Sequence, residues 1–267
     1  MSTLSVSIVQ TALFWEDKDR NLSMLEEKIM GIPEKTHLVI LPEMFSTGFS
    51  MKPELLAEKM DGPTMNWMKR MAASKKVILT GSLIIEESGN YYNRLVWMLP
   101  NGNKGYYDKR HLFAYAGEDQ HYTPGNKRLI TSVNGWKIHV QICYDLRFPV
   151  WARQQTKETP EYDLLVYVAN WPERRNHAWK TLLTARAIEN QCYTIGVNRV
   201  GEDGHQINHS GDSMLVDPLG TVLFSNEHEE LVRSFDLTKD PLNEVRNKFP
   251  FWKDADHFQM IQEDQND

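Results

Sequence analysis

Cys143 is the residue of this chain whose type and position most directly suggest chemistry. It lies in QICYDLRFP (141–149), directly after an apolar run and before Tyr144 and Asp145. A cysteine where a strand turns into a helix lies near unpaired backbone N–H groups, and these favour the reactive thiolate. Taken alone, a cysteine at such a place is more often a packed core residue. Its role therefore depends on which side chains the fold brings beside it.

Two charged residues are candidate partners for this thiol. Glu43 directly follows the apolar run LVILP (38–42), where burying a carboxylate costs free energy unless it has a partner. A partly desolvated glutamate is a suitable general base for a thiol. Lys109 lies in YYDKRHLF (106–113), whose aromatic and apolar flanks predict a segment held against the protein, where an ammonium group could stabilise an oxyanion. Singly, Glu43 is more simply a surface or helix-capping residue, and Lys109 part of a solvated charge cluster.

The elements that must position these residues alternate between strand and helix. Short apolar runs predict buried strands at 4–10, 37–42, 77–84, 136–143, 163–170 and 193–200. Amphipathic stretches predict helices at 21–30, 64–73 and 176–191. This alternation is typical of a layered α/β fold. Because 90–99 and 213–225 are hairpin-like, with turn signals at 101–103 and 218–220, we expect mixed sheets.

Length, charge and cysteine content restrict the class of protein. The 267 residues show no linker, and the 30 basic and 36 acidic residues give a net charge of −6, which argues against nucleic acid as a partner. No apolar run approaches the roughly 20 residues that span a bilayer, and the N-terminus has no basic region typical of a signal peptide. With only Cys143 and Cys192, a disulfide framework is improbable, so we expect a cytoplasmic protein with no membrane contact.

Three ordered motifs together resemble a known superfamily. The run that ends in LPE, the segment DKRHLF and the motif CYDLRFP are similar to segments of the nitrilase, or carbon–nitrogen hydrolase, superfamily, at 41–43, 108–113 and 143–149. YVANWP (167–172) and LLTARAIENQ (182–191) fit later segments of the same superfamily. The resemblance implies a single-domain, four-layer αββα sandwich with mixed sheets. It predicts a carbon–nitrogen hydrolase domain over 1–258 and a polar C-terminal tail over 259–267.

The resemblance also implies a catalytic set. The Glu–Lys–Cys triad of the superfamily corresponds to Glu43, Lys109 and Cys143, and its second glutamate to Glu118 in GEDQHYTPG. It implies that the cysteine attacks an amide carbonyl to form a thioester, which water then hydrolyses. The backbone N–H of Tyr144 is expected to join the lysine in stabilising the oxyanion. No metal or other cofactor is implied.

Further motifs resemble the omega-amidase branch, and its bacterial members in particular. These motifs are MFSTGF, CYDLRFPVWAR, ANWP and TARAIENQ. The branch implies hydrolysis of the terminal amide of 2-oxoglutaramate and 2-oxosuccinamate, so the expected partners are a small amide and water. The superfamily also implies a homodimer or larger assembly, with contact faces near 149–155 and 177–190.

A substrate with a distal carboxylate needs a cation or several N–H donors at the far end of its pocket. Arg174 and Arg175 follow ANWPE and are the candidates, although both have a simpler interpretation as surface charges. Arg147 is more simply interpreted as a structural partner of Asp145. Two aromatic residues could form the walls of a small pocket, although aromatic side chains at strand ends are more often core residues. They are Phe45 and Trp171.

Other functions fit the sequence less well. A metal site could use His205 and His209 with nearby acids Asp203 and Asp212, but GHQINHSGD is too rich in Gly and Asn for the helix that this spacing needs. A redox sensor is weakly supported, because no CxxC motif exists. A non-enzymatic binding module on the same fold remains an alternative. So do a nitrilase, an aliphatic amidase and an N-carbamoyl amidase, because loop shape decides specificity.

Overall fold

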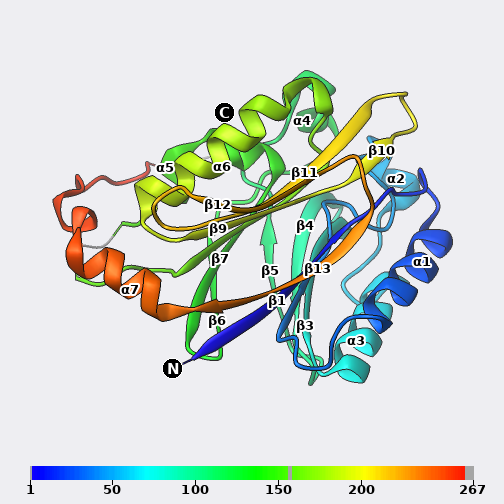
Figure 1. The fold of residues 1–267 in the computed structure, drawn as a ribbon. Coiled ribbons are helices and arrows are strands. Elements are labelled where there is room, and N and C mark those ends of the chain that lie inside the picture. The colour runs from blue at the N-terminus through cyan, green and yellow to red at the C-terminus, as the bar shows by residue number, and fades with distance from the viewer. Residues whose placement is uncertain (1, 156–157, 262–267) are drawn as a thin grey trace.

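The protein folds into two β-sheets that lie face to face, with helices on the outer side of each (Figure 1). The structure is a computed structural model that describes residues 2–155 and 158–261. One sheet has the strand order β13-β1-β2-β3-β4-β5, and the other β10-β11-β9-β8-β7-β6, with β12 beside β11. Both sheets combine parallel and antiparallel pairs. The predicted single-domain αββα sandwich with mixed sheets is therefore confirmed.

The first sheet carries its apolar residues on both faces. Its strands are β1 (Thr3–Gln10), β2 (Leu38–Ile40), β3 (Ile78–Glu87), β4 (Asn90–Met98), β5 (Lys104–Asp108) and β13 (Leu231–Thr238). Leu38 and Ile40 of β2 belong to the core between the sheets, whereas Val39 packs on the helix side. That side is covered by α1 (Lys18–Met30) and α3 (Pro63–Lys75). A strand covered on both faces reads as a continuous apolar run, as observed.

The second sheet is covered by one long helix. Its strands are β6 (Leu129–Val133), β7 (Trp136–Ile142), β8 (Leu164–Ala169), β9 (Tyr193–Asn198), β10 (Val200–Glu202), β11 (Asn208–Val216) and β12 (Val222–Glu227). The covering helix is α6 (Asn176–Asn190), which buries Trp179 and Leu183. A Cβ at Gly196 of β9 would lie 2.5 Å from Leu183 and 2.6 Å from Trp179, so only glycine lets α6 pack this closely.

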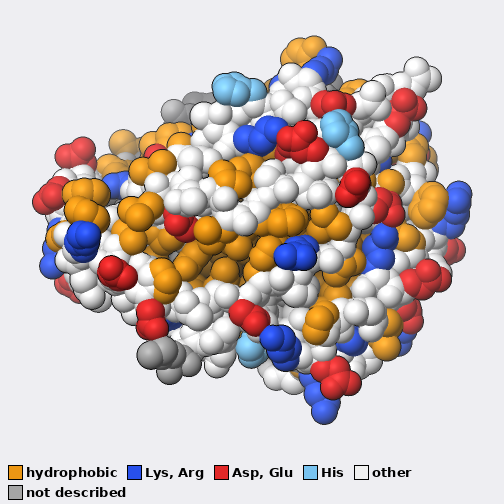
Figure 2. Space-filling view, viewed as in Figure 1, with side chains coloured by type: hydrophobic (Ala, Val, Ile, Leu, Met, Phe, Trp, Pro, Cys, Tyr) orange, Lys and Arg blue, Asp and Glu red, His pale blue; other side chains and the backbone are white. Residues whose placement is uncertain are grey.

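Short elements complete the fold and lie mainly at the strand ends. They are α2 (Pro53–Leu56), α4 (Glu118–His121), α5 (Pro149–Ala152), α7 (Lys239–Lys248) and the 3-10 turns Ala114–Ala116, Cys143–Arg147, Glu173–Arg175 and Phe251–Asp254. Figure 2 shows apolar side chains gathered on the face where β12 and β13 lie. Phe224 of β12 and Leu231 and Phe235 of β13 are only partly buried and pack against the core between the sheets, so the core reaches the surface at this edge of the sandwich.

The predicted elements are confirmed, with shifts at their ends. The helix predicted to begin at residue 21 begins at Lys18, because Asp17 caps it by accepting a hydrogen bond from the backbone N–H of Arg20. Both predicted hairpins form, as the antiparallel pairs β4–β5 and β11–β12. The boundary at 258 stays a prediction. Of the predicted tail, 259–261 is exposed and lies outside helix and strand, whereas 262–267 lies outside the described residues.

The described residues, 2–155 and 158–261, include no helix with the length and apolar character to cross a bilayer.

Candidate active site

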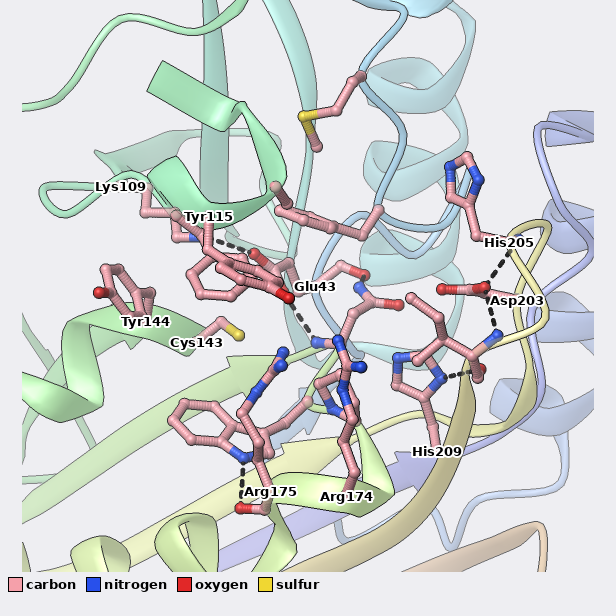
Figure 3. A pocket seen from close by; sticks show the side chains of 18 of the residues that line it. Glu43, Lys109, Tyr115, Cys143, Tyr144, Arg174, Arg175, Asp203, His205 and His209 are labelled. Atoms are coloured by element: carbon pink, nitrogen blue, oxygen red, sulfur yellow. Dashed lines mark hydrogen bonds and ion pairs between the residues drawn. The ribbon is translucent and has the colours of Figure 1, made fainter. Parts of the chain in front are cut away.

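Cys143, Glu43 and Lys109 line one cavity of about 250 Å³ (Figure 3). Glu43 follows β2, which has parallel neighbours on both sides, and Cys143 follows β7, which is parallel to β8, so each lies just beyond the carboxyl end of a strand with a parallel neighbour. Lys109 follows β5 at the edge of the first sheet. Side chains at the carboxyl ends of parallel strands commonly form ligand sites in α/β proteins. The two sheets thus contribute to one site, although its residues are far apart in sequence.

The backbone turns sharply at Cys143. Its φ of +43° lies in the left-handed region, which a non-glycine residue adopts only when its surroundings hold it there. The buried carboxylate of Asp145 accepts hydrogen bonds from the backbone N–H of Ile142 (3.0 Å) and of His111 (2.9 Å). Tyr107 also donates its hydroxyl hydrogen to Asp145, at 2.7 Å. Asp145 therefore ties the cysteine turn to the segment that carries Lys109.

Lys109 is buried between two carboxylates. Its Nζ lies 2.9 Å from Glu43 Oε1 and 2.8 Å from Glu118 Oε2, and the lysine is only 1% exposed. Burial alone would lower the pKa of Lys109, but the charges of Glu118 and then Glu43 outweigh it and raise the pKa above its ordinary value. Lys109 is therefore a fixed ammonium group next to Cys143.

The two glutamates are fully buried and well supplied with donors. Glu43 accepts hydrogen bonds from Lys109, from Asn93 Nδ2 at 2.8 Å and from the backbone N–H of Asn170 at 2.8 Å. Glu118 accepts from Lys109, from Asn93 at 3.2 Å and from the backbone N–H of Phe113 at 2.6 Å. Burial raises the pKa of Glu118, and Lys109 opposes that rise. Glu118 lies in this cluster, as the sequence predicted.

The Cys143 thiol is held in its protonated form. Burial raises its pKa well above the ordinary value, the charge of Glu43 raises it further, and Lys109 opposes both. This direction is opposite to the thiolate expected at such a turn, because burial and the charges of Glu43 and Glu118 outweigh the one ammonium group of Lys109. A thiol in this state needs a base at the moment of attack.

The cavity wall also carries three arginines. Arg147, Arg174 and Arg175 line it, and in the described part of the chain none of them forms an ion pair with a carboxylate. Arg147 lies over the ring of Trp171 at 4.8 Å, and Arg175 over Phe113 at 5.1 Å. Burial lowers the pKa of Arg175, and so does Arg174. Unpaired guanidinium groups on an apolar wall favour an anionic ligand.

The structure corrects two predictions about this wall. Trp171 lines the cavity as predicted, but Phe45 does not: it is fully buried on the helix side of the first sheet, 5.9 Å from Trp67. Phe49 lines the cavity instead, because the chain turns back between them, with Gly48 at φ +76°. The interpretation of Arg147 as a partner of Asp145 is also wrong. The donors found on Asp145 come from Ile142, His111 and Tyr107.

The segment 203–209, which carries His205 and His209, forms the wall of the cavity opposite Cys143 (Figure 3). Asp203, His205 and His209 line the cavity, whereas Asp212 pairs with Lys180. Burial lowers the pKa of His209 to about 4, with Arg199 adding to the effect. Within the described ranges, no group of three His, Cys, Asp or Glu side chains is placed to hold a metal ion.

Several residues of the site were not identified from the sequence. Asn93 and Asn170 contact Glu43, and Phe49, Phe113 and Tyr115 line the cavity. A signal did exist for Asn93, which interrupts the strand-like run YYNRLVWM with an amide that an apolar strand interior does not need. No comparable signal marks the aromatic residues, which are equally suited to a core.

Comparison with known proteins agrees with the family resemblance that the sequence motifs indicated. A family model described as "Carbon-nitrogen hydrolase" matches residues 5–247. The omega-amidase YafV of Escherichia coli (strain K12) is 40% identical over 261 residues, which is 97% of this chain and 100% of that protein. The 2-oxoglutaramate amidase of Bacillus subtilis (strain 168) is 30% identical over 253 residues, or 94% of this chain and 96% of that protein.

A solved structure shows the same fold. The protein XC1258 from Xanthomonas campestris, described as a CN-hydrolase superfamily protein with an arsenic adduct in its active site, superposes with a TM-score of 0.95. It is 41% identical, and the alignment covers 98% of this chain and 100% of that chain. The motifs, the fold and these similarities agree: the chain belongs to the carbon–nitrogen hydrolase family, within the nitrilase superfamily.

Proposed function

We propose that this protein is an omega-amidase that hydrolyses the terminal amide of 2-oxo dicarboxylic acid monoamides, such as 2-oxoglutaramate and 2-oxosuccinamate. One observation carries the proposal. The cavity that contains Cys143, Glu43 and Lys109 also contains arginines with no carboxylate partner among the described residues. The similarity to an E. coli omega-amidase and a B. subtilis 2-oxoglutaramate amidase supports this choice of substrate.

The first step forms the thioester. Cys143 Sγ attacks the amide carbon while Glu43 takes the thiol proton, which is necessary because burial keeps the sulfur protonated. The carbonyl electron pair moves to oxygen, where Lys109 and the backbone N–H of Tyr144 stabilise the negative charge. When the tetrahedral intermediate collapses, Glu43 gives its proton to the nitrogen, the carbon–nitrogen bond breaks and ammonia leaves.

The second step releases the acid. A water molecule attacks the thioester carbon and gives a proton to Glu43, and Lys109 and Tyr144 again stabilise the oxyanion. Collapse breaks the carbon–sulfur bond, and the departing sulfur regains its proton from Glu43. Glu118 holds Lys109 through both of its carboxylate oxygens, at 3.0 and 2.8 Å, and so fixes the ammonium group beside the reacting carbon. We assign no metal to either step.

The distal carboxylate of the substrate is assigned to Arg174 and Arg175. Both arginines line the cavity, and Arg175 lies over the ring of Phe113 at 5.1 Å. Figure 3 shows both side chains directed into the cavity, and Trp171 donates its indole N–H to the backbone carbonyl of Arg175 at 2.9 Å. Phe49, Phe113 and Trp171 then enclose the apolar middle of the substrate.

Replacing Arg174 or Arg175 with methionine should selectively weaken binding of an anionic amide. We expect the KM for 2-oxoglutaramate to rise by about 10- to 100-fold in at least one of the two variants, because a hydrogen bond to a charged group is lost. The KM for an uncharged amide of similar length should change little. Arg233→Met, at an exposed position on β13, is the matched control. An equal rise for both substrates would mean that the arginines do not bind the carboxylate.

A screen of ammonia release tests the proposed function. The substrates are 2-oxoglutaramate, glutamine, simple aliphatic amides, ureido acids and nitriles, and a Cys143→Ala variant serves as the blank. We expect the highest kcat/KM for 2-oxoglutaramate. A higher value for a nitrile, a ureido acid or a simple amide would assign the protein to another activity of its family and overturn the substrate proposed here.

We also propose a homodimer built through the outer helices of the second sheet. Val150 of α5 is 52% and Ile188 of α6 is 51% exposed, which leaves apolar side chains on the face expected to form the contact. Sedimentation of the wild type and of Ile188→Glu tests this, and a monomeric wild type would contradict it.

We further propose a cytoplasmic location, because both cysteines are free thiols and a reducing compartment keeps them in that state.

A further inference from the structure

Asn93 touches every charged member of the cluster beside Cys143. It lies in β4, is fully buried, and pairs across the sheet with Ile84 of β3. Its Nδ2 donates to Glu43 Oε1 at 2.8 Å and to Glu118 Oε1 at 3.2 Å. Its backbone carbonyl accepts a hydrogen bond from the backbone N–H of Lys109 at 3.0 Å. One residue thus contacts two carboxylates and the lysine between them.

Among uncharged side chains of this size, only an amide can make these side-chain contacts. Carboxylate oxygens accept hydrogen bonds, so the group between Glu43 and Glu118 must carry two donors. The NH₂ group of asparagine has two N–H bonds and no charge. An aspartate of the same shape at position 93 would put a third carboxylate against the first two, and an alanine would leave both without this donor.

We propose that Asn93 is the positioning residue that holds Glu43 and Glu118 side by side. In this arrangement Glu43 can take the proton of Cys143 while Glu118 holds Lys109. The proposal rests on the catalytic roles assigned above, and goes beyond them by adding a residue outside the Glu–Lys–Glu–Cys set. The two carboxylates share Lys109 as their only cation within hydrogen-bond distance in the described part of the chain. Two carboxylates close together repel, and a neutral double donor reduces the cost of keeping both ionised.

A prediction about protonation follows. Glu43 must be ionised to take the thiol proton. A substitution that lets the two carboxylates bind a proton more readily therefore moves the loss of this base to a higher pH. The other titratable groups that face the two carboxylates are Lys109, Cys143 and Tyr122, on three different segments. All three side chains remain when Asn93 is replaced, and its contact to Lys109 is made by the backbone, not by the side chain. The acid limb of the pH–rate profile therefore reports the loss of the amide donor.

The experiment compares Asn93→Ala and Asn93→Asp with the wild type, using 2-oxoglutaramate hydrolysis over a range of pH and thermal unfolding of each protein. In Asn93→Ala we expect kcat to fall by about 100-fold, the usual consequence of a misplaced catalytic group. We expect the acid limb of kcat/KM to move to a pH higher by about one unit, since two repelling carboxylates have lost a donor. Asn93→Asp, which keeps the shape, should move the limb further.

Asn90→Asp is the matched control. Asn90 lies on the same strand but is exposed, and its side-chain hydrogen bonds, to Ser88 and Thr123, are long at 3.4 Å. It should keep the wild-type rate and acid limb. If a folded Asn93 variant loses activity at all pH values while its acid limb stays in place, Asn93 is a structural residue and the inference is overturned. If the wild type itself hydrolyses no amide, the proposed function fails instead, so the two failures are distinct.

Discussion

Replacing Cys143 with alanine should abolish amide hydrolysis and leave the fold intact. The thiol is the group that bonds to the substrate carbon, and no other described nucleophile of this kind lines the cavity. Loss of a catalytic nucleophile typically costs about 10⁴-fold or more in kcat, so ammonia release should fall to the level measured without enzyme. The substitution removes one sulfur atom from a residue that already borders the cavity, so the thermal unfolding midpoint should change little. Ammonia release and a melting curve measure both effects.

Cys192→Ala is the control for this prediction. Cys192 lies between the end of α6 and the start of β9 and is fully buried, and burial raises its pKa to about 12, so it is neither reachable nor reactive at neutral pH. This variant should keep the wild-type kcat, and iodoacetamide should label Cys143 much faster than Cys192. Turnover by Cys143→Ala within about tenfold of the wild type would refute the thioester route.

Replacing Lys109 with methionine should have the largest combined effect on activity and stability. Methionine keeps the length of the side chain but leaves Glu43 and Glu118 buried without a cation. Breaking a buried ion pair by removing one partner costs about 3–5 kcal/mol of unfolding free energy, because the remaining charge stays desolvated. Hydrolysis should also be lost, since the oxyanion has lost its ammonium group. Chemical denaturation and ammonia release measure the two effects.

The destabilisation by Lys109→Met should depend on pH in a defined direction. In the wild type the folded pKa of Lys109 lies above its ordinary value of 10.5, so its contribution to stability is fully present below pH 10.5 and is lost only above it. In the variant, the unpaired carboxylates regain stability by binding protons as the pH falls. The difference from the wild type should therefore be largest at neutral pH and shrink in acid.

Lys104→Met is the control for that prediction. Lys104 is exposed at the start of β5, the strand that ends just before Lys109. Surface charges contribute little, so the free energy of unfolding should change by less than about 0.5 kcal/mol. Equal stabilities of Lys109→Met and Lys104→Met at neutral pH would show that the buried cluster does not depend on its lysine.

Much of the fold and the centre of the site could be predicted from the sequence. The continuous apolar runs are long enough to identify strands covered on both faces, and Glu43 and Cys143 each follow such a run directly. The two runs form strands of different sheets, so the strand ends alone do not bring Glu43 and Cys143 together, and the resemblance to a known superfamily supplied that expectation. Three ordered motifs then sufficed to indicate the family.

Only the tertiary structure decided the surroundings of that centre. The sequence by itself determined the strands, their alternation with helices and the positions of Glu43, Lys109 and Cys143 at element ends, because these depend on neighbours along the chain. Asn93 reaches Glu43 across a separation of 50 residues, so no local pattern predicts that contact. Likewise, the turn after β2 sends Phe45 into the core and Phe49 into the cavity, although both are aromatic residues of one motif. Packing between distant segments decided which side chain faces which space.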